Sequence, residues 1–368
     1  MVRGKNRDQL APQNIDAEAL PVQNQETFSI QKIINVFGAD IHRDTLAKAE
    51  RLGQVPQPQW KQTGSLKARR WTVDQLPAIG ERFGFLPKLD GSQVICVFSM
   101  KGGVLKTTLS FNIARLAALH NLKVCVVGLD TQGDITKALS PEQENEDTDL
   151  ATVATTARAE SGLFDVLRGN VNVFDVLCDT DLPTLKFIRE TPGLAKVDME
   201  LVSRPHREWW LKKNVIDPLK TRFDLVVLDC APSWSTLISN ALVAADLLVS
   251  PMETKISHFR NLDDFMAFLG DFERMMEIQP IKKVFVPTKY QSGRKLSSEI
   301  RSWYVQNIKG CTAGVIREAM VGEEAMSACK SLPEHAPTSS AASEMRDLML
   351  DIFRALPTQT KTAAEVAA

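Results

Sequence analysis

The 368-residue chain has no apolar run of about 18 residues, the length that a membrane-spanning helix needs. Its six cysteines show no C-x-x-C spacing, which argues against a disulfide framework or a zinc site. The N-terminal residues lack the apolar core of a signal peptide. A net charge of −1 excludes a uniformly polycationic protein, so any nucleic-acid binding would depend on a local patch. We therefore expect a cytoplasmic protein with no membrane role.

What is present divides the chain into parts of different composition. Residues 1–27 are polar and punctuated by proline, which predicts a flexible arm. Residues 28–90 form a compact basic unit, and residues 91–356 form a larger domain that is rich in apolar runs. Residues 357–368 predict a disordered tail without the basic amphipathic helix of a membrane anchor. Within the larger domain, residues 141–149 place five carboxylates in nine positions, which is typical of a solvated surface loop.

Short apolar runs alternate with helix-period segments in the larger domain. A run of this kind, without polar alternation, predicts a strand buried on both faces, and hence a parallel sheet with helices on both sides. The runs are residues 94–98, 124–129, 225–228, 247–250 and 284–286. The predicted fold class is therefore α/β, a doubly wound and mostly parallel sheet preceded by a small α-rich unit.

The segment SMKGGVLKTTLS (99–110) lies between the first of these strands and a helix. Against the usual phosphate-loop pattern G-x-x-x-x-G-K-[ST], Met100 and Leu105 replace both glycines. The order of strand, glycine-bearing turn and helix nevertheless suits phosphate, because the turn N–H groups and the helix dipole favour an anion. Lys106 would then reach the phosphates, and Thr107 would take a place on Mg²⁺. A tight turn before an unrelated helix is the alternative.

Two later aspartates favour the nucleotide interpretation. Asp229 ends an apolar strand, as does the carboxylate that holds Mg²⁺ through water in many nucleotide-binding proteins, although apolar strands commonly end in aspartate. Asp130 and Gln132 follow the second strand, at the edge where phosphates bind in doubly wound sheets. An ordinary turn or a helix cap is the alternative for Asp130.

These motifs together resemble those of the ParA/MinD family of ATPases. The deviant Walker A motif of that family, K-G-G-x-x-K-[ST], corresponds here to Lys101, Gly102, Gly103, Val104, Leu105, Lys106, Thr107 and Thr108. A glycine before the second lysine is frequent in the family but not required. GLDTQGDIT (128–136) is similar to its D-x-D-P-Q-G motif, with Gly128 in place of the first aspartate and Asp130 on the second. LDCAPS (228–233) is similar to D-C-P-P-S, and the resemblance extends over residues 94–354.

The resemblance implies that the loop binds ATP or ADP together with Mg²⁺. Residues 101–108 and Asp229 would form the nucleotide site, with Thr107 and Asp229 holding the metal. The loops at 250–255 and 287–291 are candidates for contacting the adenine.

The resemblance also assigns catalytic roles. Lys101 would reach across a nucleotide-sandwich homodimer to the phosphates of the partner, so that hydrolysis depends on dimerisation. Gly102 and Gly103 would let the backbone bend to project this lysine. Lys106 and Asp130 complete the catalytic set, with Asp130 positioning or deprotonating the attacking water.

The basic unit predicts a compact arrangement of helices and a hairpin. An apolar helical face begins at Ile30, and the helix ends at Gly38. A second helix is expected over residues 43–52, followed by a hairpin that bears lysine and proline. Thr72-x-x-Gln75 predicts a capping box that opens a third helix.

Residues 41–70 contain seven Lys or Arg residues and only two carboxylates, Asp44 and Glu50, so this stretch is strongly basic. A helix, a glycine turn, a basic helix and a basic hairpin predict a winged helix-turn-helix. The order also resembles the MerR-like winged helix-turn-helix that precedes the ATPase domain of larger plasmid ParA proteins. A solvated basic face or a dimerisation unit is the alternative. The candidate DNA contacts are Arg43, Lys48, Lys61, Lys67, Arg69 and Arg70 here, with Arg294, Arg260, Lys289 and Arg301 in the larger domain.

The leading functional hypothesis is a DNA-partition ATPase that is cytoplasmic and associated with the nucleoid. ATP would join two chains, the dimer would bind nonspecific DNA, and a centromere-binding ParB-like partner would stimulate a weak hydrolysis. A nucleotide-gated repressor that uses residues 28–85 on an operator is a second hypothesis. Positioning of non-DNA cargo, or a MinD-like membrane role, is a third.

Overall fold

The computed structural model describes residues 26–39, 41–63, 66–140, 161–317 and 320–359. The expected N-terminal arm lies almost wholly outside these residues, and the acidic segment 141–149 lies entirely outside them. Throughout the described part of the chain, no helix combines the length and the apolar character needed to cross a membrane.

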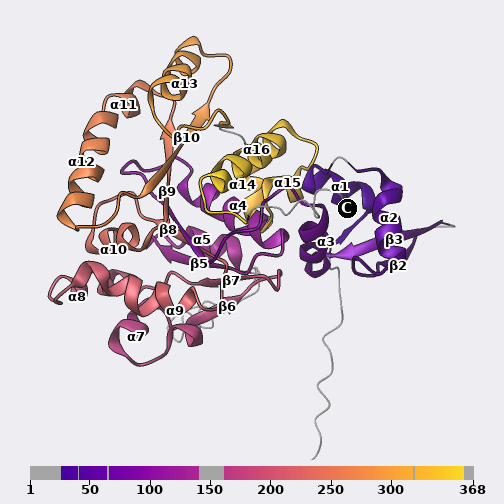
Figure 1. The fold of residues 1–368 in the computed structure, drawn as a ribbon, viewed down its shortest axis with the longest axis horizontal. Helices are drawn as coiled ribbons and strands as arrows, with labels where there is room; N and C mark the ends of the chain where they lie inside the picture. The colour runs from indigo at the N-terminus through magenta and orange to yellow at the C-terminus, as the bar shows by residue number, and fades with distance from the viewer. Residues whose placement is uncertain (1–25, 40, 64–65, 141–160, 318–319, 360–368) are drawn as a thin grey trace, which may run out of the picture.

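A mixed sheet forms the centre of the larger domain (Figure 1). Over the described residues it has eight strands in the order β11-β10-β9-β4-β8-β5-β7-β6, and only the pair β6–β7 is antiparallel. The strands are β4 (Gln93–Val97), β5 (Val124–Leu129), β6 (Leu177–Asp179), β7 (Leu185–Ile188), β8 (Leu225–Cys230), β9 (Leu247–Glu253), β10 (Lys282–Tyr290) and β11 (Ile316–Arg317). Each apolar run identified in the sequence overlaps one of these strands. The predicted α/β class with a mostly parallel sheet is therefore confirmed.

Helices cover both faces of the sheet, as expected of a doubly wound fold. In β4, Ile95 and Val97 belong to a core that includes α4 (Lys106–Leu119) and α16 (Ser340–Arg354). The intervening Val94 and Cys96 belong to a second core, with α10 (Thr236–Ala244) and α12 (Leu262–Met275). The other helices of this domain are α5 (Asp134–Leu139), α7 (Leu163–Arg168), α8 (Leu194–Leu201), α9 (Asp217–Leu219), α11 (Ile256–Phe259), α13 (Lys295–Asn307), α14 (Met320–Ser327) and α15 (Leu332–His335).

The N-terminal unit contains the helices and hairpin where the sequence predicted them. Its elements are β1 (Thr27–Phe28), α1 (Ile30–Phe37), α2 (Arg43–Arg51), β2 (Gln59–Thr63), β3 (Leu66–Thr72) and α3 (Leu76–Phe83), and the strands form an antiparallel sheet in the order β1-β3-β2. Gly38 ends α1 in a left-handed conformation. The Thr72–Gln75 capping box is present and opens a short 3₁₀ turn before α3. The role of this unit in binding DNA stays a prediction.

The N-terminal unit and the larger domain share one hydrophobic core. Phe37 and Trp71 belong to the same buried cluster as Leu119 of α4 and Phe353 of α16. Helix α3 approaches the end of α4 so closely that a Cβ atom at Gly80 would lie 1.9 Å from the Leu119 carbonyl oxygen. The change in composition near residue 90 is therefore not a boundary in packing.

Ordered chain continues into the segment expected to be a disordered tail. Thr358 forms an antiparallel bridge with Leu89. The Asp90 N–H donates to the Pro357 carbonyl at 2.9 Å, and the Gln359 N–H donates to the Lys88 carbonyl at 3.0 Å. The expected tail thus begins no earlier than residue 360, because residues 357–359 are paired with the linker that follows α3.

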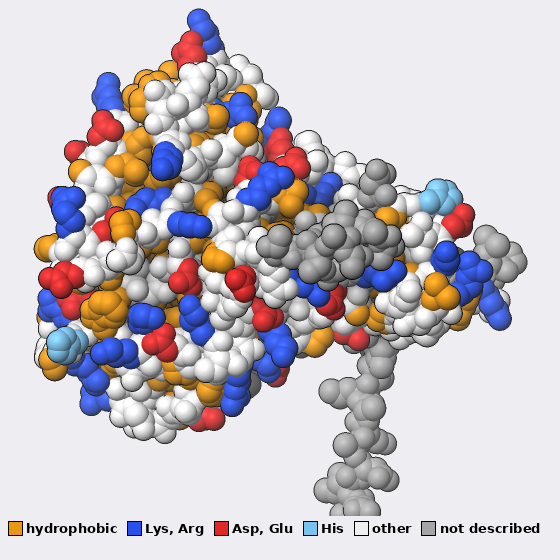
Figure 2. Space-filling view, viewed as in Figure 1, with side chains coloured by type: hydrophobic (Ala, Val, Ile, Leu, Met, Phe, Trp, Pro, Cys, Tyr) orange, Lys and Arg blue, Asp and Glu red, His pale blue; other side chains and the backbone are white. Residues whose placement is uncertain are grey.

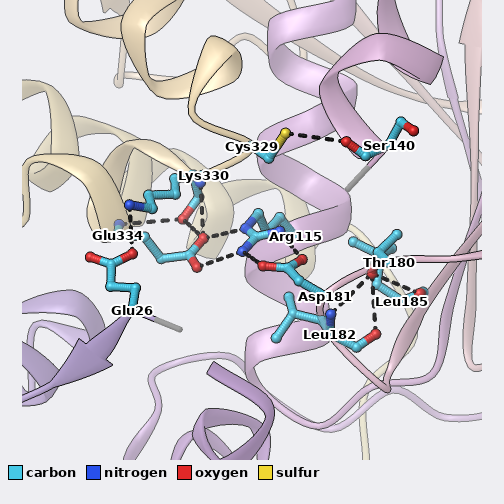
Figure 3. A network of polar contacts seen from close by, with 11 residues as sticks. Glu26, Arg115, Ser140, Thr180, Asp181, Leu182, Leu185, Cys329, Lys330 and Glu334 are labelled. Atoms are coloured by element: carbon cyan, nitrogen blue, oxygen red, sulfur yellow. Dashed lines mark hydrogen bonds and ion pairs between the residues drawn. The ribbon is translucent and has the colours of Figure 1, made fainter. Parts of the chain in front are cut away.

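A buried ionic network fastens α4 to the elements around it (Figure 3). Arg115 is 2% exposed and donates two hydrogen bonds to Asp181, both at 2.7 Å. It donates two more to Glu334 of α15, at 2.6 and 3.0 Å. Nearby, Glu26 accepts from Lys330 at 2.5 Å, so the last residues of the expected arm are tied to the loop before α15.

Candidate nucleotide site

The phosphate-loop segment turns sharply between β4 and α4. Gly103 and Leu105 both have left-handed backbone conformations, with φ of 67° and 71°. Leu105 is the residue immediately before α4, and it also packs against the core. A leucine in this conformation is strained, whereas glycine adopts it freely. The unusual residue at 105 therefore affects the backbone energy of the loop as well as its bulk.

Lys106 points back into the loop that precedes it. Its side chain is largely buried, and Nζ donates to the Lys101 carbonyl at 3.1 Å. Burial lowers the pKa of Lys106, while Asp229 and Asp130 oppose that shift. A partly desolvated ammonium beside the loop is placed to attract a phosphate once one enters.

Asp229 lies at the end of β8, fully buried beside the start of α4. Ser110 Oγ donates to Asp229 Oδ1 at 2.7 Å, whereas Oδ2 accepts no hydrogen bond from any described residue. Burial raises the pKa of Asp229 to about 6, against the opposing effects of Ser110, Thr107 and Lys106. A buried carboxylate oxygen without a donor, next to a threonine hydroxyl, has the ligand chemistry that Mg²⁺ prefers. The residues present thus fit the expected metal.

Asp130 follows β5, the strand beside β8 in the sheet. Its Oδ1 accepts from the Gln132 N–H at 3.1 Å, so the carboxylate stabilises its own turn. The alternative interpretation of a turn aspartate therefore describes the present geometry, and it is compatible with a second role when nucleotide binds. Asp130 is close enough to Asp229 and Lys106 to influence the pKa of each.

Glu190 is a carboxylate of this site that the sequence analysis missed. It follows β7 and accepts hydrogen bonds from the Asp130 and Thr136 backbone N–H groups, at 3.2 and 3.3 Å. Burial, then the charge of Asp229, raise its pKa to about 8. The one available signal was Gly128, where the family motif has an aspartate, because the space left by that residue is filled by Glu190.

Lys101 does not extend away from the chain in this structure. Its Nζ forms an ion pair with Glu253 Oε2 at 2.5 Å and donates to Ser257 Oγ at 3.0 Å. Burial would raise the pKa of Glu253, but hydrogen bonds from Lys101 and Lys255 lower it below its usual value. Glu253, at the end of β9, lies in the segment 250–255 that was expected to contact adenine, and its pairing with Lys101 was not predicted.

A cavity of about 230 Å³ opens beside the loop. Its walls include Leu105 and Thr108 from the loop, Lys289 in the last part of β10, and Met345 from α16. Of the two segments expected to contact adenine, 287–291 contributes to this cavity and 250–255 does not.

The predicted DNA contacts differ in their accessibility. Arg43, Lys48, Lys61 and Lys67 are exposed on the N-terminal unit, and Lys and Arg side chains gather near the end of its hairpin (Figure 2). Arg70 is half-buried, and so is Arg69, whose Nε lies 3.1 Å from Glu50 and whose guanidinium lies over the Trp60 ring. In the larger domain Arg260 and Arg294 are exposed. Lys289 is half-buried in the wall of the cavity. Arg301 is also half-buried, and it donates a hydrogen bond to the Ala313 carbonyl at 2.5 Å.

A family model for the AAA domain matches residues 92–280, just over half of the chain and all of the site except the wall formed by the last strands and helices. The chain belongs to the AAA domain family. Its relatives include the chromosome partitioning protein ParA of Myxococcus xanthus, 30% identical over 161 residues, which are 44% of this chain and 52% of the relative. The sporulation initiation inhibitor protein Soj of Bacillus subtilis is 30% identical over 47% of this chain and 63% of the relative. The chain thus spans less than two thirds of the length of either relative. These matches confirm the resemblance to ParA-type ATPases.

Solved structures of this fold contain nucleotides. Cobyrinic acid a,c-diamide synthase from Mycobacterium smegmatis, with an ATP analogue and magnesium, has a TM-score of 0.56 at 25% identity, over 73% of this chain and 100% of its own. A plasmid partition protein from Borrelia burgdorferi bound to AMPPNP has a TM-score of 0.58 at 20% identity, over 72% of this chain and 98% of its own. At that lower identity, the similarity to the Borrelia protein shows the fold alone.

Proposed function

We propose that this chain is a DNA-partition ATPase that binds ATP with Mg²⁺ at the loop 101–108. The observation that carries the proposal is the buried Asp229 oxygen without a hydrogen-bond donor among the described residues, next to Thr107 and Lys106. Thr107 and Asp229 would hold the metal, and Lys106 would bind the phosphates. Magnesium would neutralise charge on the phosphates during their transfer. The ATP-analogue and magnesium complex of the related synthase supports this choice of ligands.

Hydrolysis would use two residues of the site, Asp130 beside Lys106 and Lys101 within the loop. Asp130 would exchange its hydrogen bond with the Gln132 N–H for one with the attacking water. Lys101 would leave Glu253 and reach the phosphates of a second chain, which makes turnover depend on a homodimer. In a single chain the ion pair with Glu253 occupies the ammonium group of this lysine, so a weak basal rate is expected.

The chromosome partitioning protein ParA of Myxococcus xanthus, as a relative, supports partition as the biological role. The dimer would bind DNA without sequence preference, and a ParB-like centromere-binding partner would stimulate hydrolysis and release it. A cytoplasmic, nucleoid-associated protein is the corresponding location. Positioning of a cargo other than DNA is the alternative use of the same cycle.

The exposed basic side chains of the N-terminal unit favour a second candidate function, operator binding by a winged helix-turn-helix. Arg43 and Lys48 lie on α2, and Lys61 and Lys67 lie on the hairpin. Phosphate contacts from four such residues would make binding weaken steeply with salt. Deleting residues 1–90 is a poor test of this function, because the deletion would expose the core that the unit shares with α4 and α16.

The proposed function is tested by ATP turnover and by gel filtration with ATP. The wild type should hydrolyse ATP, and Asp130→Ala should accumulate as an ATP-bound dimer. Equal turnover in the two proteins would refute the role of Asp130, and an absence of ATP binding by the wild type would refute the proposal.

DNA binding is tested separately, by electrophoretic shifts with ATP, ADP and a nonhydrolysable analogue. Replacing Arg43, Lys48, Lys61 and Lys67 by alanine should abolish the shift of operator DNA while leaving the ATP-dependent shift of random DNA. Arg168→Ala with Lys196→Ala, two exposed positions of the larger domain, is the control. Operator binding that survives the fourfold change would contradict the winged-helix interpretation.

A further inference from the structure

A glycine in the middle of the sheet gives a distant carboxylate access to the nucleotide site. Gly128 lies in β5, two residues before Asp130. A Cβ atom at this position would lie 2.3 Å from Glu190 Cγ and 2.6 Å from Glu190 Cδ. Real Cβ atoms do not approach other carbons so closely, so any side chain at 128 would displace Glu190. The present position of Glu190 therefore requires glycine at 128.

The Glu190 carboxylate holds both ends of the turn that carries Asp130. Oε1 accepts from the Asp130 N–H at 3.2 Å, and Oε2 accepts from the Thr136 N–H and hydroxyl, both at 3.3 Å. In the opposite direction, the Glu190 N–H donates to Thr136 Oγ1 at 2.8 Å. Four hydrogen bonds thus join the end of β7 to the turn and to the first residues of α5.

The position of Asp130 depends on this arrangement. Among the described residues its carboxylate accepts a hydrogen bond only from Gln132, within the same turn, so the turn as a whole needs an external support. Glu190 provides it from a neighbouring strand, since β7 pairs with β5 directly. A carboxylate suits this position because it accepts from several N–H groups at once.

We propose that Glu190 is a positioning residue of the hydrolytic site: its carboxylate enters through the space that Gly128 leaves and fixes the turn that carries Asp130. An aspartate at 128 would place its side chain in the space that Glu190 now fills. The inference rests on the proposed function only where it concerns turnover, because the support of the turn is a property of the chain without nucleotide.

The first test is amide hydrogen exchange of the nucleotide-free full chain, followed by mass spectrometry. In Glu190→Ala, amides of the segment 129–137 should exchange about tenfold faster or more, the loss expected when the hydrogen bonds from the Asp130 and Thr136 N–H groups disappear. Asp179→Ala is the control, because Asp179 is an exposed carboxylate on the adjacent strand β6. Unchanged exchange of this segment in Glu190→Ala would overturn the proposal.

The second test separates binding from turnover. Glu190→Ala should lower kcat for ATP about tenfold to a hundredfold while the Kd for ATP stays the same, because the loop 101–108 is untouched. A general loss of structure would change both quantities together. Loss of ATP affinity in parallel with kcat would therefore count against a positioning role.

The third test moves the carboxylate to the other strand. Gly128→Asp alone should collide with Glu190 and lower kcat, whereas Gly128→Asp combined with Glu190→Ala should recover turnover to within about threefold of the wild type. A double variant no better than either single variant would overturn the proposal. If the wild type does not hydrolyse ATP, the proposed function fails, and hydrogen exchange still decides whether Glu190 supports the turn.

Discussion

Replacing Leu105 by glycine should give a more stable protein than replacing it by alanine. Both changes remove the leucine side chain from the core, so their difference isolates the backbone. At φ 71° and ψ 33° a residue with a Cβ atom costs about 1–2 kcal/mol more than glycine. Glycine also gives the unfolded chain more freedom, which offsets about 0.4–1 kcal/mol of that gain. Leu105→Gly should therefore exceed Leu105→Ala by about 1 kcal/mol in the free energy of unfolding.

Urea unfolding followed by tryptophan fluorescence measures this difference. The matched control is Ala267→Gly at an exposed position of α12, where the ordinary helical preference should make glycine worse by about 1 kcal/mol. Opposite signs at the two sites would identify the strain at Leu105 as a property of the loop. A Leu105→Gly protein no more stable than Leu105→Ala would refute the reasoning, because the left-handed backbone would then carry no measurable cost.

Other perturbations separate the site from the surrounding structure. Lys101→Ala should retain ATP binding but lose hydrolysis in a turnover assay. Glu253→Gln weakens the ion pair that holds Lys101, so ATP-dependent dimerisation should occur at lower protein concentration in gel filtration. Burial lowers the pKa of His120 from 6.5 to about 4. Its imidazole therefore stays neutral in the folded protein, whereas in the unfolded chain it takes up a proton below pH 6.5. Stability is therefore lost as the pH falls from 6.5 towards 4, by about 2 kcal/mol at about pH 5, and the loss between about pH 7 and pH 5 should be smaller in His120→Gln. Arg115→Met should cost about 3–5 kcal/mol in urea unfolding by leaving a buried carboxylate unpaired, whereas Arg168→Met, which breaks an exposed pair, should cost less than about 1 kcal/mol.

The strands and the phosphate loop were predictable because their signals are local. An unbroken apolar run identifies a strand buried on both faces, and a turn followed by a helix identifies the loop before α4. The side-chain direction of Lys101 was not predictable in the same way. Its partner Glu253 is 152 residues away and reaches it only because β9 pairs with β4.

Glu190 was missed for a related reason. It lies 60 residues from Asp130, and their contact depends on β7 being the neighbour of β5, an order that periodicity does not reveal. The shared core of the two parts was also hidden, since the composition changes near residue 90 while the packing continues across it. Gly80 was the one sequence feature that reflects this contact. It could not predict the contact, because glycine also occurs in helices that no other backbone approaches closely.

Helix α4 is engaged at both of its ends. Its first residue, Lys106, belongs to the phosphate loop, and its last turn contacts α3 of the N-terminal unit at Gly80 without any intervening side chain. His120, directly after α4, also accepts a hydrogen bond from the Phe85 N–H at 3.1 Å. If a ligand at the loop shifts the axis of α4, the position at which α3 packs against α4 shifts with it. Thermodynamic linkage makes this effect reciprocal. A ligand that binds the N-terminal unit and prefers one position of α3 changes the affinity of the loop for its ligand, by the same factor as the loop ligand changes the affinity of the N-terminal unit.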